Sequence, residues 1–326
     1  MKDYYKIKKV SNSSLSWLQI SPKYFDEKFN ERMDDGPEPS YFKKGRSIHE
    51  YILEPKEFDN HYVFLDYETP KSKQQKDFCE SFARQRKGKK DEKLTRAYKK
   101  AYNTKETDTK VLDKAKGLEK TFKDYIKYIK IKPLYTEILS ESMLLKLNEV
   151  RKGVLEHKKS KELLYNELHD TFGNTNKLFI QNELQIEWEH PMGLECKSML
   201  DRVVINHEKK LIQLIDLKTT SRLDKFKDSF SEYQYYRQMT FYWMALQWYF
   251  EKELKLNIEE YEKETYIIAI STSKITEIKV YKIRDKQLLD GFSEIDKLMI
   301  DLSWHFKNNK WDYSRSYYEG EGIEYI

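Results

Sequence analysis

The hydrophobic pattern of the sequence changes its period near residue 178. Before this point, apolar residues recur mainly at helical spacing. Over 178–189 they alternate with polar and charged residues, as in a half-buried strand. Two more strand-like segments, 199–205 and 211–218, follow and are joined by the polar turn 206–210. The second half of the chain is therefore expected to contain a sheet built around an antiparallel hairpin.

The rest of the pattern predicts helices around this sheet and one further pair of strands. The predicted helices cover 11–25 (with a second helix starting at Pro22), 41–53, parts of 66–110, 111–133, 138–169, 229–252 and 285–308. The second strand pair is expected at 266–271 and 275–283. Together these elements predict an α/β (α+β) fold: a central mixed sheet flanked by helices, with a helical N-terminal portion. We expect one domain over 1–326, made of N-terminal helices (1–65), a lysine-rich helical insertion (66–175) and a sheet with C-terminal helices (176–326).

Composition excludes several classes of protein. The 25 Tyr, 16 Phe and 6 Trp supply enough core material to make a fully disordered chain unlikely on physical grounds. Cys79 and Cys196 lie far apart, so a disulfide framework, a four-cysteine zinc site and a cysteine-ligated iron–sulfur cluster are not expected. No apolar run approaches the roughly 18 residues that span a bilayer, and the first residues lack the apolar core of a signal peptide. These features predict a soluble cytoplasmic protein with no membrane contact.

Positive charge is concentrated between residues 71 and 132. The formal net charge of the chain is only +5, yet this stretch is dense in Lys and Arg, including Lys87, Lys89 and Lys90. Such a segment can follow a phosphate backbone, which makes these lysines candidate DNA contacts. The alternative is an ordinary solvated helix face.

Three charged residues on the predicted hairpin are the main candidates for chemistry. Asp201 lies on its first strand, and Asp216 and Lys218 lie two apart on the second, so that both point to one face. Two carboxylates with water and phosphate oxygens suit Mg²⁺, and Lys218 can polarise a water or neutralise charge on a phosphate. The alternative is a hairpin with charged strand ends.

These residues, in this order, resemble the core signature of the PD-(D/E)XK nuclease superfamily, which implies a restriction-endonuclease-like core. More narrowly, the chain is similar to the exodeoxyribonuclease VIII-like recombination exonucleases of phage type. Three further motifs carry this resemblance: Ser13–Leu18 with Ser21–Phe25, Gly45-x-x-x-His49 leading to Leu53-Glu54-Pro55, and Gln238-x-x-x-Tyr242.

The resemblance implies roles for residues outside the hairpin. His49 would be a metal ligand beside Asp201, Asp216 and the backbone carbonyl of Leu217, and Glu183 would assist the site. Gln238 and Tyr242 would position DNA or the catalytic centre. Arg46 and Arg202 are candidate phosphate contacts. The plainer alternatives are a helix-surface histidine, an exposed strand glutamate, a partly buried helix for the Gln–Tyr pair, and a strand charge for Arg202.

The function that the resemblance implies is metal-dependent hydrolysis of DNA phosphodiester bonds, by an exonuclease on linear duplex ends in recombination. Mg²⁺ is the expected cofactor, with Mn²⁺ as a substitute. A single-strand annealing protein, a homo-oligomer and the cytoplasm of a bacterial or phage-infected cell are implied as partner, assembly and location. The alternatives are a structure-specific or single-strand endonuclease on the same core and an inactive DNA-binding or assembly protein. The sequence departs from the family at Leu200, where Pro is common, and carries Asp216 where Glu is frequent.

Overall fold

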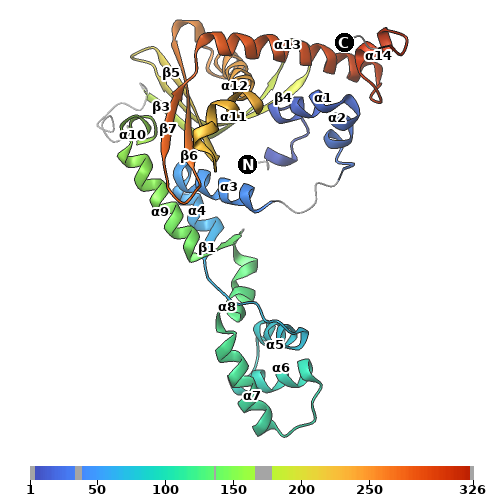
Figure 1. The fold of residues 1–326 in the computed structure, drawn as a ribbon, viewed down its shortest axis with the longest axis vertical. Coiled ribbons are helices and arrows are strands. Elements are labelled where there is room, and N and C mark those ends of the chain that lie inside the picture. Colours follow the sequence, from blue (N-terminus) through green and yellow to red (C-terminus); the bar gives the residue numbers. More distant parts are fainter. Residues whose placement is uncertain (1–3, 34–38, 136, 166–177, 324–326) are drawn as a thin grey trace. The chain divides into compact units, whose positions relative to one another are not determined.

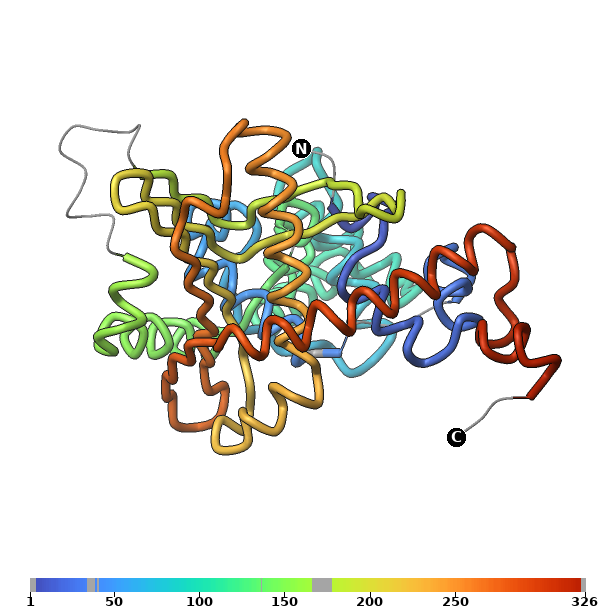
Figure 2. The backbone as a smooth tube through the Cα atoms, turned by 90° about the horizontal axis from the view of Figure 1, so that it is seen from above, coloured from blue at the N-terminus to red at the C-terminus, as the bar shows by residue number. Residues whose placement is uncertain are grey.

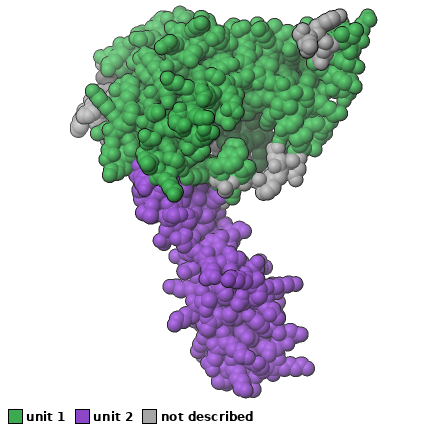
Figure 3. All heavy atoms as spheres, viewed as in Figure 1, with its two compact units in different colours: residues 1–53, 150–326 green, residues 54–149 purple. Residues whose placement is uncertain are grey.

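The computed structural model describes residues 4–33, 39–135, 137–165 and 178–323. The chain divides into two compact units, which Figure 3 shows in different colours. Unit 1 consists of residues 1–53 and 150–326, and unit 2 of residues 54–149. None of the helices in the described part of the chain combines the length and hydrophobicity that a membrane span requires.

A five-stranded mixed sheet forms the centre of unit 1 (Figure 1). The strands follow the order β3-β4-β5-β6-β7 and are β3 (Leu178–Glu189), β4 (Glu195–Asn206), β5 (Leu211–Thr220), β6 (Glu262–Ser271) and β7 (Ile278–Lys282). Neighbouring strands are antiparallel except for β5 and β6, which run parallel. The predicted α/β class, with a mixed sheet and flanking helices, is confirmed.

The helices of unit 1 frame this sheet. They are α1 (Asn12–Ile20), α2 (Pro22–Phe29), α3 (Ser40–Leu53), α10 (Lys158–Tyr165), α11 (Phe226–Glu232), α12 (Tyr235–Tyr249), α13 (Asp285–Asn308) and α14 (Arg315–Glu319). Helix α12 contacts β3, β4, α1 and α13, whereas α3 contacts β5. Figure 2 shows α13 as the long red helix near the C-terminal end of the chain. Ser11 and Ser21 cap the first two helices, because their side chains accept hydrogen bonds from the N–H groups of Ser14 and Tyr24.

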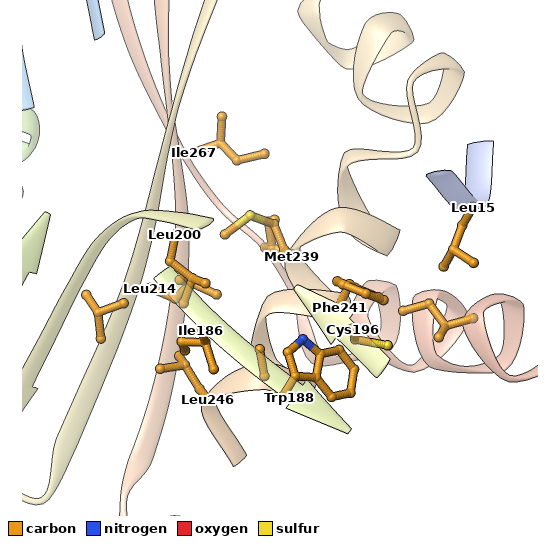
Figure 4. Close-up of a cluster of buried hydrophobic side chains, with 14 of the residues drawn as sticks. Leu15, Ile186, Trp188, Cys196, Leu200, Leu214, Met239, Phe241, Leu246 and Ile267 are labelled. Carbon is orange, nitrogen blue, oxygen red and sulfur yellow. The ribbon is translucent and has the colours of Figure 1, made fainter. Parts of the chain in front are cut away.

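Side chains of the sheet and of α12 form the main hydrophobic core (Figure 4). Leu200 and Leu214 from the sheet lie with Met239, Phe241 and Leu246 from α12, and each is fully buried. Burial of one such side chain contributes about 1.5–3 kcal/mol. This packing holds α12 against the strands that carry the candidate residues.

The alternation of buried residues in β4 changes phase at Asp201. Cys196, Ser198 and Leu200 are buried before it, and Val203 and Ile205 after it. Opposite this point, between paired residues 182 and 184 of β3, Glu183 has a φ of +47°, in the left-handed region. Both strands thus depart from regular geometry at the same level.

Unit 2 is helical, with a short two-stranded parallel sheet. Its elements are α4 (Pro55–His61), β1 (Tyr62–Phe64), α5 (Lys73–Arg84), α6 (Lys90–Tyr102), α7 (Asp108–Thr121), α8 (Lys123–Ile131), β2 (Glu137–Leu139) and most of α9 (Glu141–Glu156). Helices α5 to α8 pack around a core of their own that includes Phe78, Leu94 and Val111. The sequence suggests an insertion over 66–175, whereas the compact unit covers 54–149.

Several predicted elements differ in detail. The helix expected over 229–252 is two helices, α11 and α12, separated at Gln234, whose φ of +51° no helix interior can accommodate. Residues 137–139 pair as strand β2 rather than beginning a helix, and residues 166–169 of that predicted helix lie outside the described residues. Strand β7 begins at Ile278 instead of Ile275, which is exposed before it.

Candidate functional site

The candidate site begins where β4 and β5 separate. Their ladder ends at the pair Arg202–Ile215, one step before Asp201 and Asp216 would face each other. Beyond that pair, the Asp201 carboxylate takes the place of a strand partner, because its Oδ2 accepts a hydrogen bond from the Leu217 N–H at 2.7 Å. The separation of the strands therefore opens a space that carboxylates line, while the backbone of β5 stays paired with β6.

Asp216 and Lys218 form a buried ion pair in this space. Lys218 Nζ lies 2.7 Å from Asp216 Oδ2, and the two side chains are 16% and 1% exposed. Among the described residues, no donor makes a hydrogen bond of normal geometry to this oxygen. Burial raises the pKa of Asp216 to about 6, although Lys218 opposes the rise. For Lys218, burial lowers the pKa but the attraction of Asp216 and Asp201 outweighs it, so the pKa is raised and the ammonium stays charged.

Helix α3 brings His49 to the same space. A methyl group at Gly45 would lie 3.0 Å from Thr219 Oγ1, so the absent side chain of this glycine lets α3 approach β5 closely. His49 follows one helical turn later on the same face, and its Nδ1 lies 3.5 Å from Asp201 Oδ2. The close approach at Gly45 explains physically why glycine and histidine are four residues apart.

His49, Glu183 and Asp201 have the geometry of a cation site. One ligand atom of each lies within 4.8 Å of the others. Burial, and then the charge of Lys218, lowers the pKa of His49 to about 4, so the imidazole is neutral at pH 7 and has a lone pair available for a metal. Burial also raises the pKa of Asp201.

The donor set therefore fits a divalent cation. Carboxylate oxygens suit Mg²⁺, and the added imidazole suits Mn²⁺. Asp216, one of the predicted ligands, lies beside this group and is held by Lys218. The left-handed backbone at Glu183 is the kind of local strain that persists at functional sites.

Helix α12 contributes the predicted Gln–Tyr pair. Gln238 Nε2 donates to the Tyr242 hydroxyl at 2.7 Å and approaches Asp216 Oδ1 at 3.5 Å. The neighbouring Arg237 is fully buried and anchors the helix. Its guanidinium donates to Asn12, Ser16 and Gln19 of α1 and to Glu294 of α13, at 2.6–3.1 Å. Gln238 is therefore held over the carboxylates by a network that reaches two other helices.

Tyr235 is a site residue that the sequence analysis did not identify. Lys218 Nζ lies over its ring, 4.9 Å from the centroid, so the ammonium is held between this aromatic face and Asp216. Tyr235 is the first residue of α12, and the break at Gln234 sets its position. The signal in the sequence is the aromatic run before Gln238, which reads equally well as helix core.

The predicted DNA contacts belong to different elements of the chain. Arg202 is 2% exposed and donates to the Leu163 carbonyl at 3.0 Å and to Asn182 Oδ1 at 2.7 Å. These contacts and the burial favour the structural interpretation of Arg202. Arg46 is exposed on α3, three residues before His49. Lys87, Lys89 and Lys90 are exposed in unit 2.

Comparisons with known proteins show which family the chain is similar to. A family model described as "PDDEXK-like domain of unknown function (DUF3799)" matches residues 116–315, which include the hairpin and α12 but not His49. The chain is also similar to a solved structure of a proposed exonuclease from Eubacterium rectale, with 11% identity and a TM-score of 0.48 over 97% of this chain and 90% of that chain. At that similarity the activity of the other protein does not carry over. A search of curated proteins finds no match.

Proposed function

The chain belongs to the family of PDDEXK-like domains of unknown function, and from this premise we propose that it is a metal-dependent nuclease that hydrolyses DNA phosphodiester bonds. The observation that carries the proposal is the convergence of Asp201, Asp216 and Lys218 where β4 and β5 separate, with His49 and Glu183 beside them. Three carboxylates against one ammonium and a neutral imidazole leave this space with negative charge, which a divalent cation would balance.

Each residue has a role that follows from its position. Mg²⁺ or Mn²⁺ would be held by His49, Glu183 and Asp201. Asp216 and the Leu217 carbonyl, which are neighbours on β5, would complete this set of ligands. A bound ion would lower the pKa of water and offset phosphate charge. Lys218 is protonated, so it acts as a hydrogen-bond donor that orients the attacking water or stabilises charge on the phosphate. Gln238, on α12, holds the carboxylate of Asp216, and Tyr242 fixes Gln238.

Within this class we favour an exonuclease on linear duplex ends, acting in recombination or DNA processing. Its support is the order of motifs from Ser13 to Tyr242, which resembles the phage recombination exonucleases. Exposed Arg46, near His49 on α3, is the phosphate contact we propose at the active site. The annealing partner, the homo-oligomer and the cytoplasmic location implied by the resemblance stay predictions.

The test uses three DNAs of equal mass: linear duplex, covalently closed circular duplex and linear single strand. Each is incubated with Mg²⁺, with Mn²⁺ or with EDTA, and Lys218→Ala serves as the inactive variant. We expect metal-dependent loss of linear duplex, with circles intact and the variant inactive. Cleavage of circles would replace the exonuclease proposal with an endonuclease on the same core. Binding without cleavage under every metal would contradict nuclease activity.

A further inference from the structure

Unit 2 carries the excess positive charge of the whole chain. Residues 54–149 contain 23 Lys and Arg against 17 Asp and Glu, a net charge of +6, while the rest of the chain has 37 against 38. Within unit 2 the imbalance is greatest over residues 84–132, with 18 basic against 7 acidic residues. The charge is therefore concentrated in one segment of a unit that contains none of the candidate catalytic residues.

A hollow of about 440 Å³ gathers five lysines from two helices of this unit. Lys90 and Lys93 belong to the first turn of α6, and Lys123, Lys127 and Lys130 lie at i, i+4 and i+7 along α8. Among the described residues, Glu119 is the one carboxylate in the lining, and it pairs with Lys90 at 3.1 Å. Forty residues of sequence separate the ends of this set, so the fold, rather than local composition, brings the charges together.

A second hollow, of about 330 Å³, adjoins the first through the shared residue Gln85. Its charged lining consists of Arg86, Lys87, Arg96 and Lys100, and no acidic residue of the described chain lines it. The Arg96 guanidinium donates to the Lys87 carbonyl at 2.9 Å, which fixes the loop between α5 and α6. The two hollows together make a continuous basic track of nine cationic side chains.

The core beneath the track holds together the helices that carry these side chains. Phe78 of α5, Leu94 of α6 and Val111 of α7 are fully buried in it, and Ile126 of α8 packs against them. Like-charged ammonium groups at short range repel one another, so such a track gains stability when a polyanion binds it. Lys and Arg contact phosphate without reading base sequence. The aromatic residue in the described lining, Phe82, is buried in the core and has the Lys130 ammonium over its ring, so it offers little open face for a base to stack on.

We propose that this track binds the phosphate backbone of duplex DNA and holds the substrate of the active site in unit 1. The assignment to DNA rests on the proposed nuclease function; the assignment to a phosphate backbone rests on the lining alone. Of the three lysines expected from sequence to contact DNA, Lys87 and Lys90 line the track and Lys89 does not.

The test measures binding of the full-length protein to a fluorescein-labelled 30-base-pair duplex by anisotropy, in EDTA so that no cleavage occurs. The track variant carries Lys93→Gln, Lys123→Gln, Lys127→Gln and Lys130→Gln. Its matched control carries Lys73→Gln, Lys76→Gln, Lys110→Gln and Lys120→Gln, which remove the same charge from exposed positions of the same unit outside both hollows. A second control replaces the four track lysines by arginine.

We expect the track variant to lose at least about tenfold in affinity near 100 mM salt and its salt slope to fall by about 2–4, because each phosphate contact contributes about 0.9 to the slope. The exposed-lysine control should change less than about threefold, and the arginine variant should bind like wild type. Equal losses in the track variant and its matched control would overturn the proposal, since net charge alone would then explain binding.

Two further arms identify the ligand and guard against misfolding. Duplex RNA of the same length and inorganic polyphosphate serve as competitors; either one binding more tightly than duplex DNA would overturn the assignment to DNA. The melting temperature of the track variant should equal or exceed that of wild type, because repulsion has been removed. The binding test runs in EDTA and needs no cleavage, so a failure of nuclease activity leaves it intact.

Discussion

The two units of the chain use charge in opposite ways. Unit 1 is nearly neutral overall, but it buries Asp216, Lys218 and Arg237 and fixes each with partners. Unit 2 has a net charge of +6 and keeps its lysines mostly on the surface over a small core. A buried charge is costly unless it is paired and hydrogen-bonded, whereas an exposed one costs little. The comparison teaches that the burial of charged side chains, more than their number, distinguishes the proposed catalytic residues of unit 1 from the proposed DNA-binding lysines of unit 2.

The largest effect is expected from removing a carboxylate in unit 1. Asp201→Asn should lower the cleavage rate by about 10²–10³-fold, because the side chain both lines the cation site and fixes the Leu217 N–H. Rates of DNA loss in Mg²⁺ measure this effect. Asp290→Asn, an exposed carboxylate on α13, should leave the rate unchanged. Equal losses in both variants would show that the buried carboxylate has no special role.

Two helix glycines give a matched comparison between the units. Gly45→Leu should destabilise the protein by about 1–3 kcal/mol and reduce cleavage, since the new side chain meets Thr219 and displaces α3 with His49. A Cβ at Gly117 on α7 would meet nothing within 4 Å, so helix propensity should make Gly117→Leu neutral or stabilising by up to about 1 kcal/mol. Thermal melts compare them. A neutral Gly45→Leu would contradict the close approach of α3 to β5.

A pH series of thermal melts tests the cost of the buried carboxylate. Burial raises the folded-state pKa of Asp216 from its ordinary value of 3.8 to about 6, so the folded protein binds this proton more tightly than the unfolded chain. Asp216 should therefore contribute a loss of stability of up to about 2 kcal/mol to the metal-free protein as the pH rises from 4 through 6. The lowered pKa of His49 has the opposite effect over this range, so the contribution of Asp216 is measured as the difference between wild type and Asp216→Asn. Asp216→Asn should remove most of this loss and melt higher than wild type at pH 7.5 in EDTA, with little difference near pH 4. A large drop in the melting temperature of the variant would contradict a metal-site role.

The smallest effect is expected at Tyr235. Tyr235→Leu should slow cleavage by about 3–30-fold, the equivalent of a cation–π contact of about 0.7–2 kcal/mol, because Lys218 loses the aromatic face beneath its ammonium. Tyr235→Phe keeps the ring and should restore most of the rate. If kcat is lost equally in both variants, the hydroxyl and not the ring is what matters.

The sheet and the hairpin could be predicted from the sequence because the two-residue period of strands is a local pattern. The residues that meet where β4 and β5 separate could be predicted because the order of the motifs identifies them. The sequence could not predict Tyr235 as a site residue, because its place depends on the break at Gln234, a backbone conformation that no hydrophobic pattern reports. It also left Arg202 open, since its burial depends on contacts with residues 163 and 182, which are distant in sequence. The sequence also could not predict that the lysines of α8 and α6 line one hollow, because tertiary packing brings these two helices together.

The most direct test of the central claim measures binding and cleavage on the same sample of Lys218→Ala. A labelled linear duplex is first titrated in EDTA, and excess Mg²⁺ is then added to the complex while its length is followed on a gel. The account predicts that the variant still binds the duplex through the track of unit 2 and leaves it intact after Mg²⁺ is added, while the wild-type complex loses its DNA. Cleavage by the variant at the wild-type rate would contradict the claim that Lys218 and its two carboxylates form the active site of a nuclease.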